Sequence, residues 1–133
     1  MGIIATNDNK VALYYHSGTS LGKQTYAYFN SFEKDSLAID IAKNKVPGSH
    51  WAEIADHLDL QISDLVDREH PDFVKTYGDE DVNLEEHDWL KLLEKSPQVL
   101  TYPIVIIGEK FVQVKNPSDL SKHFESDSTG IDE

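Results

Sequence analysis

The pattern of apolar and polar positions changes its period several times, and each change marks a predicted element. Residues 10–16 carry a β-branched and aromatic run, which is typical of a buried strand. Residues 20–32 place apolar side chains at helical spacing, and residues 36–41 alternate enough for a second strand. Three hydroxyl side chains lie in the turn before this helix, and any of them can cap it. We therefore expect a βαβ unit with parallel strands at the start of the chain.

The middle of the chain has helical periodicity. After a break at residues 47–49, one apolar helix face is formed by Trp51, Ile54, Ala55 and Leu58. A short helix around Ile62 ends before Pro71, because proline restricts the residue that precedes it. Residues 71–83 are acidic and weakly patterned, so no regular element is predicted there. A capping box from Asn83 to Glu86 then opens a helix that runs to about Lys95.

The last third of the chain predicts a hairpin and a closing helix. Residues 104–107 form an uncharged strand, and Gly108 begins the turn into a second strand at residues 111–114. Asn116 and Pro117 suit the cap and first position of a helix that buries Leu120 and Phe124.

The order βαβ, helical insert, ββα predicts an α/β protein with a thioredoxin-like fold and a mixed four-stranded sheet. We expect the domain to span residues 10–124. Residues 1–9 are predicted to be a flexible arm, and residues 125–133 a disordered acidic tail.

Composition excludes several classes of function. The chain has 133 residues, no cysteine and a formal net charge of −12, with a sequence pI of about 4.7. Without cysteine, disulfides, thiolate metal sites and thiol mechanisms are excluded within this chain. The negative charge disfavours nucleic acid and anionic membranes and favours a basic partner surface. The first ten residues have no secretory-signal pattern and no apolar run spans a membrane, so we expect a cytoplasmic protein.

The turn after the first strand is a near-miss of the phosphate-binding P-loop. Gly18 and Gly22 are followed by Lys23, as in that motif. However, only three residues separate the glycines, and Gln24 stands where the metal-binding hydroxyl belongs. The motif is therefore not fulfilled.

Five segments, in order, resemble the motifs of another family. They are YHSGTS at 15–20, VPGS at 46–49, DLQISDLV at 59–66, SPQVLTYPIV at 96–105 and NPS at 116–118. Together they resemble the arsenate reductase/Spx branch of the thioredoxin superfamily, which includes the glutaredoxin-coupled reductases (ArsC). The resemblance covers roughly residues 10–124 and implies the same thioredoxin-like fold.

In such reductases a cysteine thiolate attacks the oxyanion, and the resemblance places Ser20 at that cysteine. A serine hydroxyl has a far higher pKa than a thiol and forms no disulfide with glutathione. The plainer interpretation of Ser20 is a helix N-cap. The loop of Ser17, Gly18, Thr19, Ser20 and Lys23 is a candidate anion or ligand loop through its amides. The plainer interpretation of Lys23 is a solvated lysine in the first helical turn.

The resemblance also implies three anion-binding arginines, and none stands at the matching positions, although an offset of one residue would bring Arg68 to the first of them. Their positions are occupied by Asp67, Tyr102 and Asn116. A guanidinium supplies a planar, permanently charged fork that these side chains do not replace. Arg68 and Lys115 stand next to two of the positions and are candidate basic substitutes. The site therefore reads as catalytically degenerate.

One backbone feature is implied as well. Thioredoxin folds place a cis-proline just before the third strand, facing the loop of the first helix. Pro103 occupies that position, so we expect a cis bond between Tyr102 and Pro103.

Other candidate sites have plainer explanations. His50 and His57 lie seven residues apart, but two ligands do not make a zinc site, so no metal is predicted. The acidic residues at positions 79–86 suit a helix N-terminus, with an interaction surface as the alternative. Trp51 and Trp89 fit core positions.

Three functions follow from these observations. The first is a pseudoenzyme of the arsenate reductase-like family that binds a protein partner as a regulator or adaptor. The resemblance to Spx, whose members contact RNA polymerase, implies such a role, although this chain lacks the C-x-x-C switch. The second is a glutathione-dependent reductase or transferase, and only this alternative involves a cofactor, glutathione. The third is a small-anion binder at the 17–23 loop.

Overall fold

The computed structural model describes residues 11–31, 36–78 and 83–121, which form two compact units. The sheet unit comprises residues 11–31, 36–40 and 102–121, and the helical unit comprises residues 41–78 and 83–101. The predicted arm at 1–9 and tail at 125–133 lie outside the described residues.

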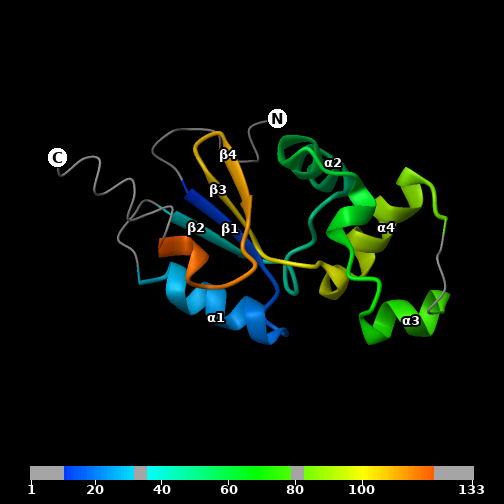
Figure 1. Cartoon of the computed structure of the whole chain (residues 1–133), viewed down its shortest axis with the longest axis horizontal. Coiled ribbons are helices and arrows are strands. Elements are labelled where there is room, and N and C mark those ends of the chain that lie inside the picture. Colours follow the sequence, from blue (N-terminus) through cyan, green and yellow to red (C-terminus); the bar gives the residue numbers. More distant parts are fainter. Residues whose placement is uncertain (1–10, 32–35, 79–82, 122–133) are drawn as a thin grey trace. The chain divides into compact units, whose positions relative to one another are not determined.

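The sheet unit contains a four-stranded mixed sheet in the order β2-β1-β3-β4 (Figure 1). The strands are β1 (Val11–Tyr15), β2 (Ser36–Asp40), β3 (Ile104–Ile107) and β4 (Lys110–Gln113). β1 pairs in parallel with β2 and antiparallel with β3, which in turn pairs antiparallel with β4. The predicted fold class and the predicted parallel βαβ pairing are therefore confirmed.

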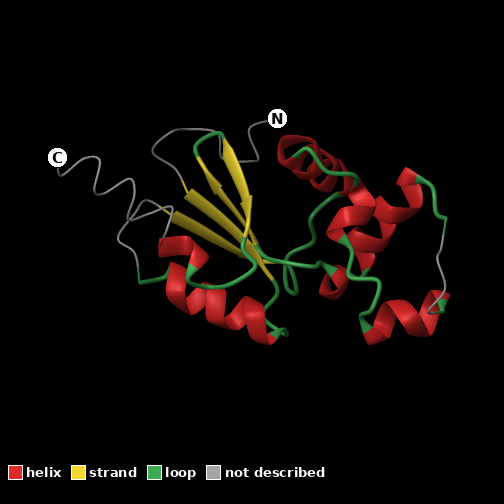
Figure 2. Ribbon diagram, in the orientation of Figure 1, coloured by secondary structure: helices red, strands yellow, loops and turns green. Residues whose placement is uncertain are grey.

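Helix α1 (Ser20–Phe29) lies against one face of this sheet, as Figure 2 shows in red beside the yellow strands. The buried cluster between them consists of Val11, Leu13, Phe29, Val105, Val114 and Leu120. α1 ends at Phe29, short of the predicted residue 32. Ser31 closes the helix, because its amide and its hydroxyl both donate to the carbonyl of Tyr28, at 3.1 and 2.6 Å.

The C-terminal hairpin turns at Gly108, whose φ of 63° lies in the left-handed region that glycine adopts without strain. Residues 108 and 109 connect Ile107 and Lys110, which pair with each other, so the predicted two-strand hairpin is confirmed. Residues 119–121 begin a helical turn. The predicted continuation of this helix to Phe124 lies outside the described residues.

The helical unit contains α2 (Gly48–Leu58), α3 (Pro71–Tyr77), α4 (Glu86–Lys95) and two 3₁₀ turns, η1 (Ile62–Leu65) and η2 (Pro97–Val99). The weak pattern of residues 71–83 did not predict an element, but the structure forms α3 there. Its start is stabilised locally: His70 Nδ1 accepts the Asp72 amide at 3.0 Å, and Pro71 occupies the first turn.

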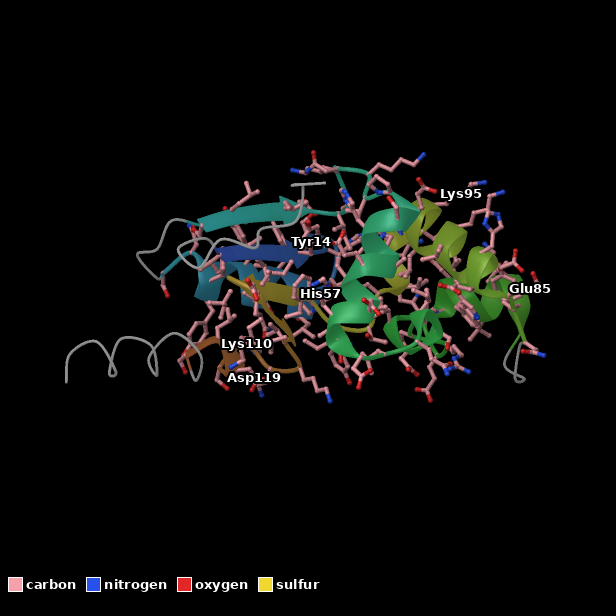
Figure 3. All side chains as sticks on the ribbon, turned by 90° about the horizontal axis from the view of Figure 1, so that it is seen from above. Tyr14, His57, Glu85, Lys95, Lys110 and Asp119 are labelled. Carbon is pink, nitrogen blue, oxygen red and sulfur yellow. The ribbon has the colours of Figure 1, made fainter. Side chains whose placement is uncertain are left out.

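The capping box of α4 is shifted by two residues from its predicted place. Glu85 and Asp88 form it in place of Asn83 and Glu86, since the Asp88 carboxylate accepts the Glu85 amide at 3.4 Å. Glu85 and Lys95 mark the two ends of α4 (Figure 3). This order of charges complements the helix dipole.

Aromatic side chains form the core of the helical unit. Trp51 is fully buried, Trp89 is 5% exposed, and both predictions of core positions are confirmed. Phe73 stacks on Trp89 with ring centroids 5.9 Å apart, which ties α3 to α4. The Trp89 indole nitrogen donates to the Leu84 carbonyl at 3.0 Å, so its one polar atom is satisfied.

Candidate functional site

The strand register brings most of the predicted site to one end of the sheet. Tyr15 at the end of β1 pairs with Asp40 at the end of β2. On the other side of β1, β3 begins at Ile104, and the carbonyl of Pro103 accepts the Val114 amide at 2.8 Å. The turn after β1, the residues before β3 and the residues after β4 therefore meet at the same end.

Thr19 caps α1, and Ser20 does not. The Thr19 hydroxyl accepts the Gly22 amide at 2.9 Å and donates to the His16 carbonyl at 3.0 Å. The interpretation of Ser20 as the N-cap is therefore wrong: Ser20 is the first residue of the helix, and it is exposed. Its hydroxyl accepts from the Gln24 amide group at 3.3 Å. Among the three hydroxyls of the turn, Thr19 has the extended backbone, φ −104° and ψ 151°, that a cap requires.

Asp40 is a member of this site that the sequence reasoning missed. Its carboxylate accepts the Ser17 amide at 3.0 Å, and the residue is only 8% exposed. Partial burial raises the pKa of the Tyr15 hydroxyl above 10.0, and the negative charge of Asp40 raises it further. A signal was present in the sequence, because a carboxylate that ends a parallel strand lies beside the end of the neighbouring strand.

The loop uses most of its own amides. The amides of Gly18 and Thr19 donate to the ring Nδ1 and the carbonyl of His16, at 2.9 and 3.2 Å. The amide of Lys23 donates to the Thr19 carbonyl at 3.0 Å. Within the part of the chain that the structure describes, only the amides of residues 20 and 21 in this loop have no hydrogen-bond partner. An incoming anion would therefore meet two free amides and the exposed Lys23.

Tyr102 and Lys115 lie together at the same end of the sheet. The Lys115 ammonium is 5.7 Å from the centroid of the Tyr102 ring, a cation–π distance. Asn116 is occupied by its own turn, since its Oδ1 accepts both the amide and the hydroxyl of Ser118, at 3.1 and 3.0 Å. The structure therefore places Lys115, one of the two candidate basic substitutes, beside Tyr102.

The predicted cis bond before Pro103 is wrong. All peptide bonds of the described residues are trans, including the one that joins Tyr102 to Pro103. The trans form is the intrinsic default by about 0.5–1 kcal/mol, and the expectation of a cis bond rested on the resemblance.

Asp67 and Arg68 belong to the helical unit and make contacts within it. The Asp67 carboxylate accepts the Glu69 amide at 3.0 Å, and the Asp67 amide donates to the Val99 carbonyl at 2.7 Å. The Arg68 guanidinium lies 5.6 Å from the centroid of the Trp89 ring. These contacts account for both side chains structurally.

The histidines of α2 do not point to a metal. His50 is 8% exposed, whereas His57 is exposed and its Nδ1 lies 3.0 Å from the Glu53 carbonyl. Among the described residues, no group of three histidine or carboxylate side chains is arranged to hold an ion.

Comparison with solved structures identifies the fold. An arsenate reductase from Vibrio cholerae matches with a TM-score of 0.72 and 14% identity, over 87% of this chain and 98% of that one. The fold is that of an arsenate reductase. An arsenate reductase (ArsC) related protein from Brucella melitensis matches with a TM-score of 0.63 and 15% identity, over 93% of this chain and 98% of the other. No family model matches the sequence, and a sequence search of curated proteins finds no match.

The arsenate reductase fold agrees with the five short segments that resemble the family's motifs. The bond before Pro103 is trans and the chain has no cysteine, so two features that the resemblance implies are not present. None of the helices in the described ranges has the length and apolarity that crossing a bilayer demands.

Proposed function

We propose that this protein is a catalytically degenerate relative of the arsenate reductases that acts in the cytoplasm by binding a protein partner, as a regulator or adaptor. The observation that carries the proposal is that the chain has no thiol. The loop at residues 17–23 supports it, because most of its amides already donate within the protein, including the Ser17 amide to the Asp40 carboxylate.

The chemistry of arsenate reduction supports this proposal. Reduction transfers two electrons from thiols to the oxyanion, and the reductases resembled here pass them through a cysteine. Ser20 has neither the low pKa nor the capacity to form a disulfide that this step needs. The Asp40 carboxylate adds a negative charge beside the loop and opposes the entry of another anion.

A second function, weak anion binding, is favoured by the two free amides at the start of α1 and the exposed Lys23. Such a site has a dissociation constant in the millimolar range, corresponding to about 4 kcal/mol. This affinity suits an adventitious or modulatory ion rather than a dedicated substrate.

Two measurements on the full chain test the proposal. In the first, the tagged protein is used to isolate partners from its native host, and an excess of the untagged chain serves as the competitor. We expect a protein that is retained in stoichiometric amounts and displaced by the competitor. In the second, the protein is titrated with glutathione and assayed for arsenate reduction, and we expect neither saturable binding nor turnover.

Glutathione-dependent turnover would instead favour the alternative of an active reductase or transferase. If no competed partner is found and phosphate binds with micromolar affinity, the small-anion alternative replaces the proposal.

A further inference from the structure

The helical unit carries an open groove of about 450 Å³ between α2, η1 and α4. Its apolar lining is formed by Ala52, Ala55, Leu60, Ile62, Leu84 and Trp89. Ala52 and Ala55 are three residues apart on α2, so their small side chains lie next to each other and leave room above the helix. Ala55, Ile62 and Trp89 are nearly fully buried, so the apolar surface that the groove offers is a small floor at Ala52, Leu60 and Leu84.

The charged side chains of the groove all have one sign. Asp56 and Glu86 line it, and among the residues that the structure describes no lysine or arginine does. Two lysines of α4, Lys91 and Lys95, line a different hollow together with Tyr77. The groove therefore combines a small apolar floor with polar and negatively charged side chains around it.

Resting on the proposed function, we infer that this groove binds a cationic amphipathic helix of the protein partner. Apolar side chains of that helix would pack on Ala52, Leu60 and Leu84. Its lysines or arginines would pair with the carboxylates of Asp56 and Glu86. The helix-in-groove mode explains why floor and rim differ in polarity.

Charge and shape argue against the other occupants. A second copy of this chain also carries a net charge of −12, so long-range repulsion opposes self-association. Nucleic acid is excluded by the same sign of charge. Small-molecule sites bury most of their ligand, whereas this groove is open to solvent.

The test uses a defined probe, a leucine–lysine peptide of about four helical turns with its leucines on one face. A peptide with glutamate in place of lysine is the control for apolar contact alone. Affinities are measured by calorimetry with the full chain at about 150 mM salt, where the long-range field is screened. We expect micromolar binding of the lysine peptide and at least tenfold weaker binding of the glutamate peptide.

Matched variants separate the groove from the general charge of the protein. Asp56→Lys with Glu86→Lys should weaken binding of the lysine peptide at least tenfold. Glu69→Lys with Glu109→Lys changes the net charge equally at exposed positions outside the groove and should weaken binding less than about threefold. Ala52→Trp, which fills the groove without changing charge, should also weaken binding. Circular dichroism checks that each variant is folded.

Equal weakening by the two charge-reversal pairs, equal affinity for the two peptides, or no binding would each overturn the inference. Sedimentation showing a dimer that Ala52→Trp dissolves would assign the groove to a second copy and overturn it as well. If the Ala52→Trp protein still captures the host partner, the groove inference fails but the proposed function stands. If the unaltered protein captures no partner, the proposed function itself fails.

Discussion

Replacing Gly22 by alanine should destabilise the sheet unit, although alanine normally stabilises a helix. A Cβ atom at this position would lie 2.0 Å from the His16 carbonyl oxygen and 2.6 Å from the Thr19 hydroxyl. The carbonyl belongs to the backbone and accepts from Thr19, so it cannot move without breaking the cap of α1. Overpacking costs roughly 1–3 kcal/mol, and a backbone clash lies at the upper end. The higher helix propensity of alanine relative to glycine offsets about 1 kcal/mol of this cost.

The net expectation for Gly22→Ala is a loss of about 2 kcal/mol in the free energy of unfolding, or about 8 °C in Tm. Thermal and denaturant unfolding, followed by circular dichroism, measure this change. Gly18→Ala is the matched control: its Cβ would approach only the His16 ring, at 2.8 Å, and a ring can rotate. The control should lose less than half as much stability. A Gly22→Ala protein as stable as the parent would refute the close packing of the loop on the start of α1.

Three further outcomes follow from the same unit. Thr19→Ala removes the cap of α1 and should lower the free energy of unfolding by about 1 kcal/mol, measured by urea unfolding. Thr25→Val should raise the free energy of unfolding by about 1 kcal/mol, because the Thr25 hydroxyl is buried without a hydrogen-bond partner among the described residues. An unchanged or lower free energy of unfolding would show that this hydroxyl has a partner. The raised pKa of Tyr15 means that folding favours the neutral phenol. The contribution of the Tyr15 phenol to the free energy of unfolding should therefore be fully present below about pH 10 and be lost as the pH rises above it. In unfolding measured from about pH 9 to 11, Tyr15→Phe should make the fall in stability less steep.

Periodicity predicted the sheet unit well because its elements are defined by strong local signals. The uncharged run at Ile104–Ile107 and the glycine turn after it strongly favour a hairpin. In contrast, α3 has seven residues, too few for a helical repeat to stand out. Its start depends on the His70 side chain, which the sequence marks only as a residue before proline.

The location of the candidate site could be predicted from the sequence, but only some of its contacts could. The resemblance pointed to the turn after β1, and the register brings Tyr102, Pro103 and Lys115 to the same end of the sheet. The hydrogen bond of the Ser17 amide to the Asp40 carboxylate joins residues 23 positions apart, so it is found only when the parallel pairing of β1 and β2 is considered. The cis bond before Pro103 was expected from the resemblance, and the structure has the intrinsically favoured trans form instead.

Glutaredoxin-coupled arsenate turnover of a short variant series tests the central claim, a silent reductase site, most directly. The unaltered chain should show no turnover. Ser20→Cys alone should react with alkylating reagents, because the helix N-terminus and Lys23 favour a thiolate, and still reduce no arsenate.

The reason is the missing positive charge. Each charge-assisted contact is worth about 1.5–3 kcal/mol, so two of them change the rate by about two to four powers of ten. Adding Tyr102→Arg and Asn116→Arg to Ser20→Cys should therefore recover part of the activity. The Tm of each variant is measured as a control for folding, because Asn116→Arg removes two hydrogen bonds to Ser118. The account predicts silence for the unaltered chain and the single variant, and measurable turnover for the triple variant. Turnover by the unaltered chain, or a single variant as fast as the triple one, would contradict it.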